Sequence, residues 1–71
     1  MRNIRLEIRE KIKELRKKRG ITQQRLSELT DIDYKYIQKI EGKNPPNIKI
    51  ETLEKLAKAF NISISKLVDF K

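Results

Sequence analysis

Residues 20–43 read GITQQRLSELTDIDYKYIQKIEGK, and this stretch decides the fold. It contains two short helical patterns, over 23–30 and 34–41, and Gly42 stops the second one. Between them the chain must reverse at Asp31, a residue type that tolerates the left-handed conformation better than most residues with a side chain. The stretch therefore predicts two helices joined by a sharp turn.

A short phrase occurs three times in the chain: an isoleucine, a residue that can cap a helix, and an apolar residue four positions beyond the cap. The three instances are Ile21-Thr22 with Leu26, Ile32-Asp33 with Ile37, and Ile62-Ser63 with Leu67. Each instance pairs an N-cap with a hydrophobic staple. Each therefore predicts a helix start.

A longer helix is predicted before this pair, over about residues 3–19. Its apolar residues recur at the spacing of one helical face and are Ile4, Ile8, Ile12 and Leu15. Four basic residues over 16–19 suit the negative end of the helix dipole, and Gly20 fits a left-handed C-cap.

Two further helices are predicted after an extended loop that contains Pro45 and Pro46, which cannot continue a helix. Apolar residues recur at helical spacing over about 50–60, and a short helix follows over about 64–69. We therefore expect one compact all-α domain of five helices over 1–71. The core is expected to use the apolar residues of the first four helices.

The composition suits a small binding domain better than an enzyme. The 71 residues include 18 Lys and Arg against 10 Asp and Glu, a net charge of +8, and neither Cys nor His. Thiolate nucleophiles, Cys-ligated zinc and the commonest general base are therefore absent. We expect no catalytic site, no metal and no cofactor. The short apolar runs predict neither a membrane span nor a signal peptide, so a cytoplasmic location is expected.

Two helices joined by a short turn in a basic single-domain protein form a helix-turn-helix. The string over 20–43 resembles the helix-turn-helix of the Cro and phage-repressor type, the XRE family. The matching residues follow the family order and spacing: Arg16, Thr22, Gln23, Ile37, Ile40, Glu41, Gly42, Leu53, Leu56, Ala57 and Phe60.

The turn departs from the family pattern at three positions. Asp31 stands where the family usually has glycine, Ser27 where it has alanine, and Thr30 where it has an apolar residue. Ser27 and Thr30 can be accommodated there if their hydroxyls bond back to the preceding turn of their helix. Asp31 places a negative charge near the side that would face DNA.

The resemblance implies a five-helix, lambda-repressor-like fold, with the helix over 34–41 in the major groove and the helix over 23–30 across the backbone. Ile37 and Ile40 are expected to face the preceding helix. The residues then left for reading bases are Tyr34, Lys35 and Lys39. A lysine can donate to guanine O6 and N7, and a tyrosine can offer its hydroxyl or its ring.

Phosphate contacts are predicted at the two ends of this helix pair, from Thr22, Gln23, Lys43 and Asn44. Gln23 begins a helix whose free N–H groups attract phosphate, and the matching family position contacts the DNA backbone. The resemblance further implies a partly buried structural ion pair between Arg16 and Glu41.

Three features keep two interpretations each. Tyr36 is either a half-buried packing residue or a DNA contact. Asp33 is either only an N-cap or also an acceptor for a cytosine amino group. The excess of basic residues over 1–20 is either a solvated face or a long-range field, from the end with Arg2, Arg5 and Arg9, that attracts DNA.

The sequence therefore predicts a transcriptional regulator, of repressor or controller type, that binds a palindromic operator on double-stranded DNA as a homodimer in the nucleoid. The dimer contact is assigned to Ile64, Val68 and Phe70, on a helix too short to bury them all. One alternative is an antitoxin or adaptor whose main partner is another protein. Another is a binder of nucleic acid without sequence preference, or of RNA.

Overall fold

The three helix starts predicted by the repeated phrase are capped in the structure. The computed structural model describes residues 3–69. The side-chain oxygens of Thr22, Asp33 and Ser63 each accept a backbone hydrogen bond from the following turn, at 3.0, 3.3 and 3.1 Å. These bonds satisfy donors that have no partner within the helix. They open α2 (Gln23–Thr30), α3 (Tyr34–Ile40) and α5 (Ile64–Leu67).

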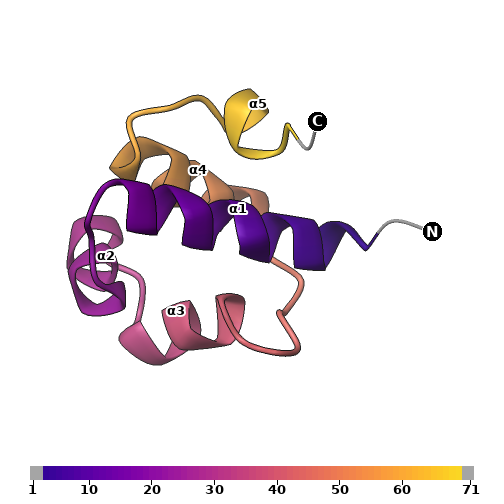
Figure 1. Cartoon of the computed structure of the whole chain (residues 1–71), viewed down its shortest axis with the longest axis horizontal. Helices are drawn as coiled ribbons and strands as arrows, with labels where there is room; N and C mark the ends of the chain where they lie inside the picture. The colour runs from indigo at the N-terminus through magenta and orange to yellow at the C-terminus, as the bar shows by residue number, and fades with distance from the viewer. Residues whose placement is uncertain (1–2, 70–71) are drawn as a thin grey trace.

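Two more helices, α1 (Ile4–Lys18) and α4 (Ile50–Ala59), complete a fold that has five helices and no strand within residues 3–69. In Figure 1, α1 runs across the middle of the molecule, with α5 on one side of it and α3 on the other. The radius of gyration is 11.0 Å, close to the roughly 11 Å of a compact chain of this length. The prediction of a compact five-helix, all-α fold is confirmed.

Three helices are followed within two residues by a residue with positive φ: Gly20 at 65°, Asp31 at 60° and Asn61 at 57°. After Gly20 and after Asn61, the next backbone N–H bonds a carbonyl five residues earlier, at 3.0 and 2.9 Å. This is the Schellman arrangement, which satisfies the last carbonyls of a helix. The left-handed conformations predicted for Gly20 and Asp31 are confirmed, and Asn61 is a third that the sequence analysis missed.

All five helices contribute side chains to one core, in which Phe60 is the largest fully buried residue. α2 packs on α3 and α4, and α5 packs on α4 and α1. The buried apolar residues are Ile8, Ile12, Leu26, Ile32, Ile37, Ile40, Leu53, Leu56, Ala57, Phe60 and Leu67.

Three apolar side chains expected in the core are instead exposed: Ile4 by 60%, Leu29 by 45% and Ile50 by 73%. The expectation that the core uses the apolar residues of the first four helices is wrong for these positions. Ile4 and Ile50 are the first residues of α1 and α4, where the apolar stripe extends past the packed part of the helix. Leu29 stands at the edge of the buried stripe of α2.

The last helix is shorter than the predicted range of 64–69, because its regular bonding ends at Leu67. Val68 is the C-cap residue, and the Asp69 N–H reaches the Lys66 carbonyl at 3.3 Å. The Asp69 carbonyl accepts from Lys11 Nζ at 3.4 Å, which joins the end of the described chain to α1.

Candidate nucleic-acid interface

The start of α2 is joined to α1 and to the end of α3 by a hydrogen-bonded cluster around Glu41. The Glu41 side chain is 1% exposed and accepts from Arg16 through Nε at 2.7 Å and Nη2 at 3.0 Å. Arg16 Nη1 also donates to the Ile21 carbonyl at 2.9 Å. Gln23 Nε2 donates to Glu41 Oε1 at 3.1 Å. The cluster therefore includes Gln23, which sequence reasoning did not place there.

Two predicted backbone contacts, Thr22 and Gln23, lie next to each other at this helix start. The exposed Thr22 hydroxyl is occupied as the cap of α2. The half-buried Gln23 amide is held by Glu41, so a buried carboxylate restricts its orientation. Charge-assisted hydrogen bonds are shorter and stronger than neutral ones. The α2 terminus therefore presents an ordered polar surface.

The turn between α2 and α3 is stabilised by two hydroxyl groups. The buried Thr30 Oγ1 donates to the Leu26 carbonyl at 2.7 Å, as expected, and accepts from the Ile32 N–H at 3.2 Å. The Ser27 hydroxyl donates forward to the Ile32 carbonyl. Ser27 is therefore accommodated by a forward bond and not by a bond back to its own helix, because the left-handed Asp31 brings the Ile32 carbonyl within its reach.

α3 buries one face and exposes the other. Ile37 and Ile40 are fully buried. The exposed residues of the helix are Tyr34, Lys35, Gln38 and Lys39. All three predicted base-reading residues therefore lie on the solvent side of α3, with the Tyr34 side chain 41% exposed. Tyr36 is partly buried against the core, which supports its packing interpretation.

The chain after α3 is held by α1. Arg9 Nη1 donates to the Gly42 carbonyl at 3.1 Å, and Arg9 Nη2 forms an ion pair with Glu10 at 2.8 Å. Lys43 and Asn44, the other two predicted phosphate contacts, follow directly and are exposed. Sequence reasoning placed Arg9 in a diffuse basic field and missed this specific contact, since no pattern links residues 33 positions apart.

The predicted DNA contacts come from three parts of the chain: the start of α2, the exposed face of α3 and the loop after α3. Thr22 and Gln23 lie at the start of α2, and Lys43 and Asn44 follow the end of α3. In Figure 1, α3 forms one edge of the molecule, with α2 at one end and the loop to α4 at the other. The exposed face of α3 is open to solvent. Because Gln23 bonds Glu41, the C-cap residue of α3, the start of α2 lies beside the end of α3.

The three residues assigned to the dimer contact differ in accessibility. Val68 is 36% exposed. Ile64 is partly buried against the core, so only part of its side chain can meet a partner. Phe70 lies outside the described residues. Leu67, between them, is fully buried.

None of the helices within residues 3–69 has the length and apolar character that a membrane crossing requires. A family model described as a helix-turn-helix domain matches residues 10–70 of the chain. The match includes the turn, both flanking helices, α4 and α5. Comparisons with curated proteins and with solved structures gave no match.

Proposed function

Because this chain belongs to the helix-turn-helix domain family, we propose that it is a DNA-binding transcriptional repressor of the Cro and phage-repressor type. The observation that carries the proposal is the division of α3 into a buried face and a polar face. Ile37 and Ile40 fix the helix on the core, while Tyr34, Lys35 and Lys39 are left on its solvent side. A helix docked in the major groove reads base edges with side chains on its outer face.

In this proposal, residues at the start of α2 and residues after α3 hold the DNA backbone. Gln23 and Thr22 contact phosphate at the α2 terminus, where free N–H groups favour an anion. Lys43 and Asn44 contact phosphate after α3. Such contacts fix the register and orientation of the protein and carry no direct sequence information.

The proposal includes a homodimer that binds a palindromic operator in the cytoplasm, associated with the nucleoid. One helix-turn-helix reads only a few base pairs, and two modules about one DNA turn apart supply the remaining specificity. Val68 and the accessible part of Ile64 support a two-fold contact through α5, because an isologous interface uses the same patch on both subunits. Phe70 belongs to the same proposed contact.

The experiment that tests the proposal is selection of bound fragments from random duplex DNA by the full chain. We expect an inverted repeat whose half-sites are centred about 10 to 10.5 base pairs apart. The variant Lys39→Ala is the matched control, and we expect it to select the repeat with relaxed preference at particular positions. Recovery of fragments without a common sequence would contradict the proposal and favour a binder without sequence preference.

A further inference from the structure

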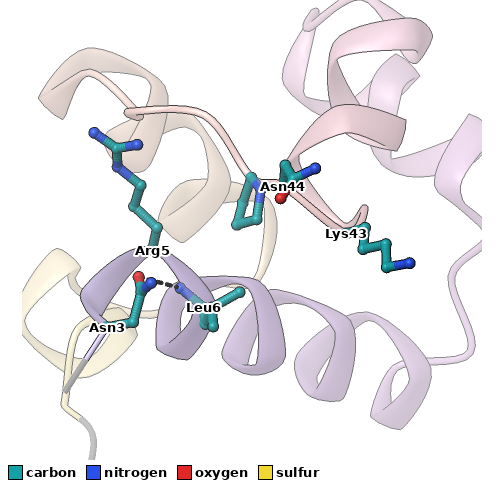
Figure 2. A pocket seen from close by; sticks show the side chains of 6 residues that line it. Asn3, Arg5, Leu6, Lys43 and Asn44 are labelled. Atoms are coloured by element: carbon teal, nitrogen blue, oxygen red, sulfur yellow. Dashed lines mark hydrogen bonds between the residues drawn. The ribbon is translucent and has the colours of Figure 1, made fainter. Parts of the chain in front are cut away.

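A pocket lies between the start of α1 and the chain that follows α3 (Figure 2). One wall consists of Asn3, Arg5 and Leu6, and the other of Lys43, Asn44 and Pro45. Two walls far apart in the sequence therefore meet at the end of α3 that carries the predicted phosphate contacts. Neither the helix-turn-helix pattern nor the family match assigns a role to Arg5.

The lining of this pocket suits an anion. It contains one guanidinium, one ammonium and two side-chain amides, and no carboxylate. Within residues 3–69, neither Arg5 nor Lys43 takes part in an ion pair. Arg9, one turn further along α1, is by contrast paired with Glu10. The positive charge at this end of α1 is thus available at Arg5.

The two walls are tied to each other. Arg9 Nη1 donates to the carbonyl of Gly42, the residue before Lys43, at 3.1 Å. Pro45 is buried, and the two prolines restrict the backbone of this loop. The backbone positions of Arg5 and Lys43 are therefore fixed relative to each other before a ligand binds. This lowers the entropy that is lost on binding.

We propose that Arg5 contacts a phosphate of the DNA backbone directly, and that this pocket extends the contact of Lys43 and Asn44 along the same strand. Arg9 is a positioning residue in this arrangement, because it fixes the loop to α1 without facing the pocket. The inference rests on the proposed function and adds a residue of α1 to the DNA-contacting surface.

The direction of the two cationic side chains favours a polyanion over one small anion. Figure 2 shows Arg5 and Lys43 extending away from each other on opposite sides of Asn44. A single phosphate ion between the walls could not contact both charged groups at once. A strand of DNA presents a row of phosphates, so separate phosphates can meet the two cations.

The test compares the full chain with Arg5→Gln and with Lys55→Gln, an exposed cation on α4 whose loss changes the net charge equally. Affinity for a short duplex is measured as a function of chloride concentration. Each phosphate contact contributes about 0.9 to the slope of log affinity against log salt. Because the proposed dimer carries two copies of Arg5, we expect the affinity of Arg5→Gln to fall about 12-fold less than that of the native chain between 50 and 200 mM salt. Lys55→Gln should keep the native slope.

A second arm uses the same duplex with single neutral methylphosphonates placed along each strand. At one position beside the half-site, we expect the methylphosphonate to lower the affinity of the native chain. The same methylphosphonate should not change the affinity of Arg5→Gln. Inorganic phosphate, added at matched ionic strength, should not compete. Competition by inorganic phosphate at low concentration would overturn the inference in favour of a small-anion site.

The failures of the two proposals are distinguishable. Duplex binding by the native chain with an unchanged salt slope for Arg5→Gln overturns the Arg5 inference alone. No duplex binding by the native chain overturns the proposed function and the inference with it. Circular dichroism of Arg5→Gln shows whether the variant is folded, and Arg5→Lys, which keeps a positive charge, should restore the native slope.

Discussion

The guanidinium of Arg16 meets the carboxylate of Glu41 side on, with 2.7 Å between Nε and Oε2 and 3.0 Å between Nη2 and Oε1, across 25 residues of sequence. The Glu41 side chain is 1% exposed and the Arg16 side chain 14%. A buried carboxylate that loses its partner keeps its desolvation cost without compensation. The two residues therefore act as one unit.

Removal of Arg16 alone should destabilise the protein more than removal of both partners. We expect Arg16→Met to cost about 3 to 5 kcal/mol, because it leaves the Glu41 charge buried and unpaired. The double variant Arg16→Met/Glu41→Leu should recover part of this loss. Urea unfolding followed by circular dichroism measures both. A double variant no more stable than Arg16→Met would show that the pair contributes net stability beyond charge compensation.

Substitutions on the outer face of α3 should reduce sequence preference, whereas substitution of Gln23 should reduce affinity for every duplex. Tyr34→Ala and Lys39→Ala should each cost about 1 to 3 kcal/mol on the best site and relax the preference at particular base pairs. Gln23→Ala should weaken binding to specific and scrambled duplexes alike, since a phosphate contact is independent of sequence. Equal losses on both duplexes for all three variants would remove α3 as the reading element. Because Gln23 also bonds Glu41, thermal unfolding serves as the control.

The left-handed turn residue offers a stability test. Asp31 has φ of 60°, a conformation that costs a residue with a Cβ more than glycine. We expect Asp31→Gly to raise the free energy of unfolding by about 0.5 to 1 kcal/mol and the melting temperature by roughly 2 to 8 °C. Asp33→Gly is the matched control: it removes a cap at φ −53° and should lower stability by a few tenths of a kcal/mol. An equal effect at both positions would contradict the conformational explanation.

Local chemistry predicted three of the helix starts because the same three-residue unit stands at three of the four breaks between helices. The break between α3 and α4 lacks the unit, and Lys49 makes no side-chain cap there. Gly20, Asp31 and Asn61 are left-handed, and each is followed by an isoleucine and then by a capping residue. The isoleucine and the cap are predicted from the sequence in all three copies, whereas the left-handed position is predicted only for Gly20 and Asp31. Asn61 occupies the equivalent place, and Asn is the residue that most often substitutes for Gly there.

The contacts that sequence reasoning missed depend on the three-dimensional arrangement of α1. Arg9 reaches the Gly42 carbonyl and Arg5 lines a pocket with Lys43 because the first half of α1 lies beside the loop that follows α3. Helical periodicity identifies which face of a helix is apolar. It does not show how much of that face is covered by neighbouring helices. The exposed Ile4 and Ile50 are for this reason the clearest errors of the sequence-based core.

Salt dependence separates DNA binding from binding to a protein partner. A dimer that makes about 6 to 10 phosphate contacts should lose on the order of 10³ to 10⁵ in affinity for duplex DNA between 50 and 200 mM salt, because counterions are released from the DNA. Fluorescence anisotropy with a labelled duplex measures this. A nearly flat dependence would favour the antitoxin or adaptor alternative, in which DNA is not the main partner.

The dimer contact is tested at Val68, which is 36% exposed at the end of α5. Two copies of a two-fold patch would bring two introduced lysines close together in an apolar contact, where unpaired charge is costly. We therefore expect Val68→Lys to abolish the dimer in sedimentation experiments while the helical circular dichroism signal is retained. Operator binding should weaken far more than for any single phosphate contact, since each monomer then binds its half-site alone. Leu29→Lys is the matched control, because it places the same charge on another exposed apolar residue, on α2, and should leave the dimer intact. A native chain that sediments as a monomer at concentrations where it fills its operator as one unit per site would exclude the two-fold contact.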